Sequence, residues 1–164
     1  MSAETEAGEL DYELTFEQFA IGAVGGVLGA LLFGIFIQFA ATDFAVAIAV
    51  PGVYGLEGPL PVAAWGIHLF HGALLGLIYV IVSHYEPFFQ YAHSVRSAAG
   101  LGIGFGIVLT VLVAMFLLPF QFGVIGATDV IDVPTITAEI AAVSLVGHML
   151  FGLVVALTYA MPTD

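Results

Sequence analysis

Three histidines lie inside long apolar stretches of this 164-residue chain: His68, His71 and His148. An imidazole can ligate a metal ion, relay a proton or hydrogen-bond to the backbone. An ionisable side chain in apolar surroundings usually faces the interior of a helix bundle or a cavity. The three histidines are therefore the first candidates for chemistry. The alternative is that each ring is satisfied by backbone carbonyls or serines, and Ser144, one turn before His148, is such a partner.

The histidine pattern occurs twice along the chain. A shift of 80 residues needs no gap and matches His68 with His148, Gly72 with Gly152, Tyr79 with Tyr159, Gly22 with Gly102, and Gly26 with Gly106. Self-similarity at a fixed offset is typical of duplicated structural units. We interpret the pattern as a two-helix unit that was duplicated and fused, with repeats at about 15–83 and 95–163.

The elements that position these residues are predicted by composition. Of all residues 61% are hydrophobic and only 9% are charged, whereas soluble domains carry about a quarter charged residues. Four segments without formal charge each reach the length of about 20 residues that a membrane crossing needs. The sequence predicts an all-α, integral membrane four-helix bundle, with helices at about 17–41, 60–83, 96–119 and 138–161. Because each repeat has an even number of helices, the two repeats are expected to be parallel to each other, related by an axis along the membrane normal.

The ends of the elements give further expectations. Residues 1–14 read as an acidic disordered tail, and residues 15–164 as a single transmembrane domain. Thr15 is expected to cap the first helix, with Gln18 at the capping-box position. Pro119 and Gly123 predict that the third segment ends in a surface loop. Arg96 lies between the second and third helices, so the positive-inside rule places that loop and both termini in the cytoplasm of a multi-pass cell-membrane protein.

Charge excludes several classes of partner. The chain has one basic residue, thirteen acidic residues and a formal net charge of −12. Nucleic acid needs Lys and Arg to neutralise phosphates, so it is not an expected partner. The chain has no cysteine, which excludes disulfides and thiolate ligands. An acidic chain without lysine resembles the proteins of halophilic archaea, where molar salt screens acid–acid repulsion, and the whole chain resembles small four-helix membrane proteins of those organisms.

The glycines allow two interpretations. Small residues let helices in lipid approach closely, and this predicts that Gly22, Gly26, Gly102 and Gly106 pack helices together. Gly72 and Gly152 follow the two matched histidines by four residues and lie on the same helix face. The alternative is that these glycines make room for a flat ligand between helices.

The layout of histidines and glycines resembles the four-helix core of b-type cytochromes. The resemblance implies a haem b with His68 and His148 as axial ligands of the iron. It also implies that Gly22, Gly26, Gly102 and Gly106 leave space for the macrocycle. His71, with Tyr54 and Trp65, would donate hydrogen bonds to the propionates. The chain departs from cytochrome b because the second level of paired histidines is absent and no basic residue lies near the expected propionates.

The same residues allow two other kinds of ligand. A quinone or another small molecule could lie between the histidines. A divalent ion at the outer helix ends could be held by His68 with Glu57, Asp132 or Glu139, although their spacing matches no zinc signature.

Motifs for enzyme chemistry are absent from the sequence. It contains no GxSxG, HExxH or P-loop, and no pair of carboxylates lies within the apolar segments. The sequence therefore predicts a non-enzymatic membrane subunit, of a respiratory or energy-transducing complex, with haem b as its candidate cofactor. The alternatives are a small oligomeric channel or carrier with a histidine-lined pathway, and a structural protein that only binds partners. Expected partners are the lipid bilayer and other membrane subunits or a second copy.

Overall fold

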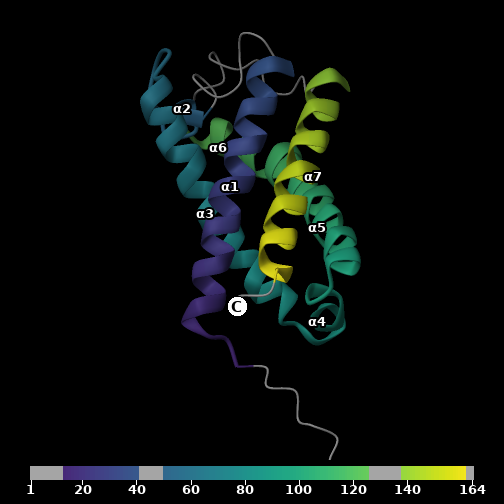
Figure 1. The fold of residues 1–164 in the computed structure, drawn as a ribbon. Coiled ribbons are helices and arrows are strands. Elements are labelled where there is room, and N and C mark those ends of the chain that lie inside the picture. Colours follow the sequence, from purple (N-terminus) through teal and green to yellow (C-terminus); the bar gives the residue numbers. More distant parts are fainter. Residues whose placement is uncertain (1–12, 41–49, 126–137, 162–164) are drawn as a thin grey trace, which may run out of the picture.

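The computed structural model describes residues 13–40, 50–125 and 138–161, and within these ranges every regular element is a helix (Figure 1). Four helices are long and apolar enough to cross a membrane: α1 (Phe16–Ala40), α3 (Pro61–Ser83), the continuous helix Val95–Ile125, and α7 (Ala138–Ala160). The predicted all-α class with four long apolar helices is confirmed. The acidic tail falls almost wholly outside the described residues.

The start of α1 forms the predicted capping box. The Thr15 backbone N–H donates to Gln18 Oε1 at 2.8 Å, and the Gln18 N–H donates to Thr15 Oγ1 at 3.2 Å. These bonds satisfy backbone groups that a helix N-terminus otherwise leaves without partners. At α3, Pro61 is the first helical residue, where its missing N–H costs little.

The third long helix extends beyond the predicted loop. It consists of α5 (Val95–Leu109), a π-helical segment η2 (Thr110–Leu117) and α6 (Leu118–Ile125). A π-helix has a wider turn than an α-helix, and η2 ends just before Pro119, which cannot donate a regular helical hydrogen bond. The Thr110 hydroxyl donates to the Gly106 carbonyl at 3.0 Å where η2 begins. The helix thus passes through Pro119 and Gly123, and the predicted surface loop is helical up to Ile125.

The long helices are ordered α3, α1, α7, α5 by their close packing, with α1 against both α3 and α7 and α7 also against α5 (Figure 1). The sequence of α1 explains its central place, because it carries glycines on two faces. Gly22 and Gly26 face α3, whereas Gly25 and Gly29 face α7. Small residues on both faces let two helices approach one helix closely.

Two short helices mark the ends of the bundle. Helix α2 (Val50–Gly52) lies at one end, called here the α2 end, and α4 (Glu86–Ala92) at the other, called the α4 end (Figure 1). At the α2 end the Gln121 side-chain amide donates to the Val53 carbonyl at 3.3 Å, which ties α6 to the segment after α2. That segment turns at Gly55 and Gly58, whose φ angles of 71° and 84° favour glycine.

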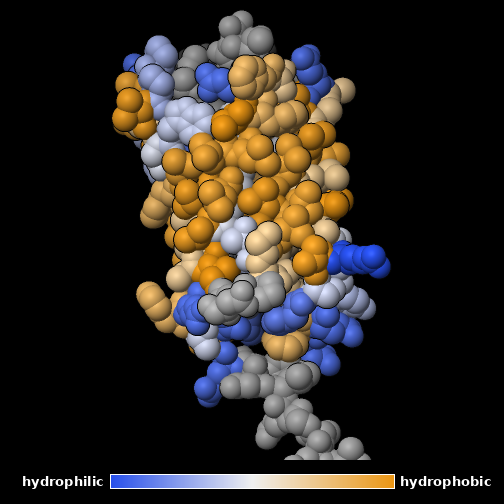
Figure 2. Space-filling view, in the orientation of Figure 1, coloured by the Kyte–Doolittle hydropathy of each residue, from blue (hydrophilic) through white to orange (hydrophobic). Residues whose placement is uncertain are grey.

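The outer surface has an apolar band between two hydrophilic ends, as Figure 2 shows for one face. Each long helix contributes exposed apolar side chains to the surface, among them Val24, Ile81, Leu112 and Val146. The interior is small and made largely of aromatic and β-branched side chains, including Phe33, Tyr79, Val80, Phe151 and Val155. Apolar groups therefore cover the outside as well as the inside, which is typical of helices surrounded by lipid.

Candidate functional site

The predicted glycines lie in two helix seams. In the α1–α3 seam, a Cβ added to Gly26 would lie 2.1 Å from the Gly72 carbonyl oxygen. In the α5–α7 seam, a Cβ at Gly102 would lie 2.3 Å from the Gly152 oxygen, and one at Gly106 would lie 2.2 Å from the His148 oxygen. Real Cβ contacts are never this short, so backbone touches backbone in both seams. The glycines make room for a neighbouring helix at these places.

The structure brings His68 and His148 to one side chain, Phe33 of α1. The Phe33 ring centroid lies 5.7 Å from that of His68 and 4.7 Å from that of His148. His148 is 7% exposed and Phe33 also 7% exposed, so this contact is internal. The sequence predicted His68 and His148 as a matched pair, but it gave no sign of the aromatic ring that contacts both.

Each of the two imidazoles is hydrogen-bonded inside the bundle. His68 Nε2 lies 2.9 Å from the Ala30 carbonyl oxygen, to which its N–H donates. His148 Nδ1 lies 2.9 Å from the Ser144 carbonyl oxygen and 3.2 Å from Ser144 Oγ. The predicted contact between Ser144 and His148 is confirmed. Because His148 is held through Nδ1, its Nε2 is the nitrogen left to face a ligand, whereas the Nε2 of His68 is already bonded.

This arrangement does not fit a haem between the two histidines without rearrangement. Phe33 is locked against α7, since a Cβ on Gly147 would lie 1.9 Å from its ring. A macrocycle ligated by both imidazoles would have to displace Phe33 and break the bond between His68 and Ala30. Haem b therefore stays a prediction.

His71 belongs to a separate contact at the α2 end. Its Nε2 is hydrogen-bonded to the Tyr54 hydroxyl, and the two rings stack with centroids 5.7 Å apart and planes at 26°. Trp65, the other predicted donor, packs against Gly34 and edge-on to His68 at 6.0 Å. Tyr54 and His71 thus bond to each other and attach the segment after α2 to α3.

The divalent-ion site has no counterpart in the described part of the chain. No group of three His, Asp or Glu side chains within residues 13–40, 50–125 and 138–161 could hold a metal ion. Of the predicted acidic ligands, Glu57 and Glu139 are among these residues, and Asp132 lies outside them.

A polar cluster at the α4 end was missed by sequence reasoning. The rings of Tyr79 and Tyr159 lie 6.0 Å apart, and Tyr159 Oη is 3.5 Å from His84 Nδ1. The His93 ring is 6.1 Å from Tyr159 on another side. The 80-residue match of Tyr79 with Tyr159 was the available signal. His84 and His93 gave none, because histidines at helix ends need no special explanation.

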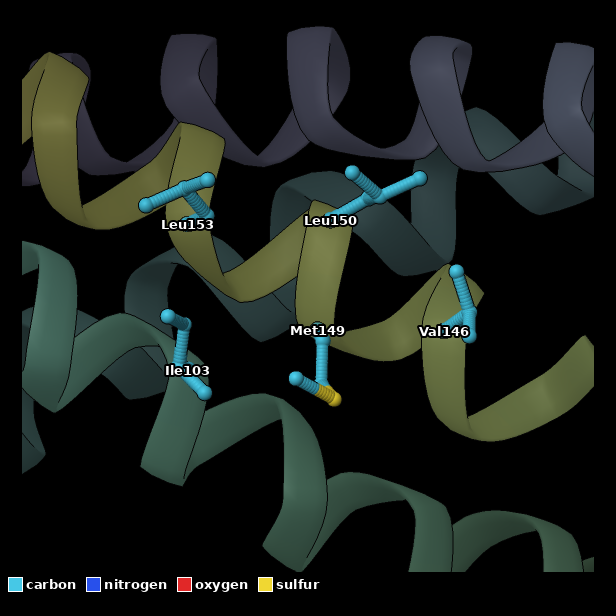
Figure 3. A pocket seen from close by; sticks show the side chains of 5 residues that line it. All are labelled: Ile103, Val146, Met149, Leu150 and Leu153. Atoms are coloured by element: carbon cyan, nitrogen blue, oxygen red, sulfur yellow. The ribbon is translucent and has the colours of Figure 1, made fainter. Parts of the chain in front are cut away.

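A hollow on the outer surface is purely apolar. It lies between α5 and α7, has a volume of about 160 Å³, and is lined by Ile103, Val146, Met149, Leu150 and Leu153 (Figure 3). Such a lining can contact hydrocarbon but offers no group for acid–base or ligand chemistry.

In comparison with known proteins, no family model, no curated protein and no solved structure matches this chain. The local geometry is therefore what bears on function. In this chain His68 and His148 are hydrogen-bonded inside the bundle, the glycines of the two seams bring helices together, and the outer surface is apolar.

Proposed function

We propose that the chain is a small, non-enzymatic integral membrane subunit that acts by packing its outer surface against other membrane-embedded helices. Four helices of sufficient length and hydropathy support insertion into a bilayer. The hydrogen bonds of His68 and His148 support a structural role for the interior. In this proposal the helices form a packed scaffold, and partners contact its outer surface.

The duplication of a two-helix unit is part of this proposal. The hairpins α1–α3 and α5–α7 are each joined by a glycine seam. Residues that the 80-residue shift matches also meet in space, since Tyr79 contacts Tyr159 and both His68 and His148 contact Phe33. The close packing of α1 against α7 is not repeated between α5 and α3, so these contacts support duplication of the hairpin but not a twofold arrangement of its two copies.

One observation carries the partner-binding role: a glycine pair on α5 that no other described helix covers. Gly100 and Gly104 have the four-residue spacing of small-residue helix contacts, yet apart from the adjoining turns of α5 no atom of the described residues lies within 4 Å of a Cβ added to either. Their neighbours on the same helix, Gly102 and Gly106, are in backbone contact with α7. A GxxxG pair on an apolar helix is typical of a face that binds another transmembrane helix.

Purification of the tagged chain from its native membrane in a mild detergent tests this role. We expect a partner chain, a second copy or another subunit, in fixed stoichiometry. Gly104→Leu should remove it, because the larger side chain holds the partner helix away. Gly66→Leu is the matched control, since Gly66 is also exposed with open space beside it, but has no glycine partner one turn away. Equal yields of partner from both variants would contradict the proposal.

A b-type cytochrome subunit is the second candidate function. It is favoured by the Nδ1 bond of His148 to Ser144, because metal-ligating histidines are commonly oriented in this way. It requires Phe33 to leave its place against the two imidazoles. Oxidised and dithionite-reduced absorption spectra of protein purified with haem supplied test it. A Soret band lost in both His68→Ala and His148→Ala would establish the haem. A flat visible spectrum of folded protein would leave both imidazoles as structural groups.

A further inference from the structure

Two polar atoms in the cluster at the α4 end are buried without a hydrogen-bond partner among the described residues. They are Tyr79 Oη and His84 Nε2. Tyr79 is 0% exposed, so its hydroxyl group cannot reach the surface. A buried polar group without a partner is costly, and native proteins commonly satisfy such groups with an internal water molecule.

Tyr159 connects the two groups. Its ring centroid lies 6.0 Å from that of Tyr79 and 6.2 Å from that of His84. The Tyr159 hydroxyl oxygen is 3.5 Å from His84 Nδ1. The three side chains therefore form one group. Tyr79 lies in α3, His84 directly follows the last residue of α3, and Tyr159 lies in α7.

The hydrogen-bonding roles of the two atoms are complementary. His84 Nδ1 lies 2.9 Å from the Val80 carbonyl oxygen and donates its hydrogen there. In a neutral imidazole Nε2 is then an acceptor. The Tyr79 hydroxyl carries a hydrogen and can donate it. A molecule that accepts from Tyr79 and donates to His84 would satisfy both atoms, and water has these two capacities.

The surroundings of the cluster favour a small neutral occupant. Phe105 packs edge-on to Tyr79 at 5.3 Å, and Phe89 packs edge-on to His84 at 5.6 Å. These rings shield the cluster with apolar surface and add no charged group to it. His93, which is exposed, lies 6.1 Å from Tyr159 and connects the cluster with the solvent at the α4 end.

We propose that Tyr79, His84 and Tyr159 form a binding site for internal water at the α4 end of the bundle. The water accepts a hydrogen bond from Tyr79 Oη and donates one to His84 Nε2, with the Tyr159 hydroxyl beside it. The site is independent of the partner face on α5. It places a hydrated polar group between α3 and α7 at the α4 end.

Thermal unfolding of the full chain in detergent distinguishes a bridged hydroxyl from an unpartnered one. If water bridges Tyr79, then Tyr79→Phe should lower the unfolding midpoint by about 2–4 °C for the bond that is lost. If the hydroxyl is unpartnered, removing it relieves a penalty, and the midpoint should stay or rise. Tyr91→Phe, at an exposed residue of α4, is the control and should leave the midpoint unchanged.

Water-edited solid-state NMR of the wild-type chain in bilayers gives a readout that does not depend on a variant. With ¹⁵N-labelled histidine, we expect magnetisation from water to reach His84 earlier than His68, whose Nε2 is bonded to a backbone carbonyl. Transfer to His84 as slow as transfer to His68 would overturn the proposal. Where Tyr79→Phe folds, it should slow the transfer to His84.

Discussion

Glycine-to-alanine changes have opposite consequences at different positions of this chain, although all of them add one methyl group. At Gly26 the added carbon would lie 2.1 Å from a carbonyl oxygen of the facing helix. This oxygen belongs to the backbone, so it cannot move aside unless the helix moves. At Gly66 nothing lies within 4 Å. Sequence alone offered helix packing as one of two interpretations of Gly26, and it could not show which glycines face outward.

We predict that Gly26→Ala destabilises the bundle by about 1–3 kcal/mol, the usual cost of overpacking. Gly66→Ala should be neutral or stabilise by up to about 1 kcal/mol, because alanine is the better helix former. The difference between the two unfolding free energies in the same detergent is the measurement. Equal effects of the two changes would show that the α1–α3 seam is not packed backbone to backbone.

The histidines mark the limit of sequence reasoning at the residue scale. Their pairing was visible in the 80-residue shift, and Ser144 was a correct partner for His148. The contact with Phe33 could not be predicted, because a phenylalanine in an apolar helix gives no sign of the face it occupies. The bond between His68 and Ala30 joins two helices whose relative register the sequence does not specify.

At the scale of elements, the four long helices follow from hydropathy, while the short ones do not. Helix α4 has only seven residues, EPFFQYA, too few for a periodic pattern to be recognised. The π-helical segment η2 depends on how Pro119 is accommodated, which local propensity does not reveal. The order of helices around α1 likewise depends on two glycine faces acting together.

Helix α4 is expected to lie at the membrane–water interface. The exposed side chains beside or within it are Tyr85, Phe88 and Tyr91, and aromatic side chains favour the headgroup level.

We predict that brominated lipids labelled near the headgroups quench the fluorescence of the tryptophan introduced by Phe88→Trp. A tryptophan at Leu112→Trp should be quenched by labels deep in the acyl chains. Both are placed in a Trp65→Phe background, since Trp65 is the one native tryptophan. Equal depths for the two would contradict the interfacial placement of α4.

At the scale of the whole molecule, the class was predictable because composition alone leaves too little polar surface for a soluble domain of this size. The orientation rests on Arg96, the single basic residue. The α4 end, which precedes Arg96 in the chain, should face the cytoplasm with both termini. The proposed partner face was not predictable, since the 80-residue shift matches Gly102 and Gly106 with glycines and assigns no role to Gly100 and Gly104.

Single-cysteine labelling tests the orientation, because the chain has no cysteine of its own. In intact cells, a membrane-impermeant maleimide should label Leu56→Cys at the α2 end and not Tyr91→Cys at the α4 end. Both residues are exposed, so accessibility within the fold is matched. Labelling of Tyr91→Cys alone would invert the orientation, and disruption of the cells should expose both sites.

Cross-linking from the glycine face of α5 tests whether this face binds another transmembrane helix, as proposed. Val108 is exposed one turn beyond Gly104 on the same face, so a photoreactive probe on Val108→Cys would flank the contact without filling it. We predict one dominant protein cross-link in the native membrane, lost when Gly104→Leu is added and absent from the control Val24→Cys on α1. Similar weak cross-linking from both positions, unaffected by Gly104→Leu, would contradict the account.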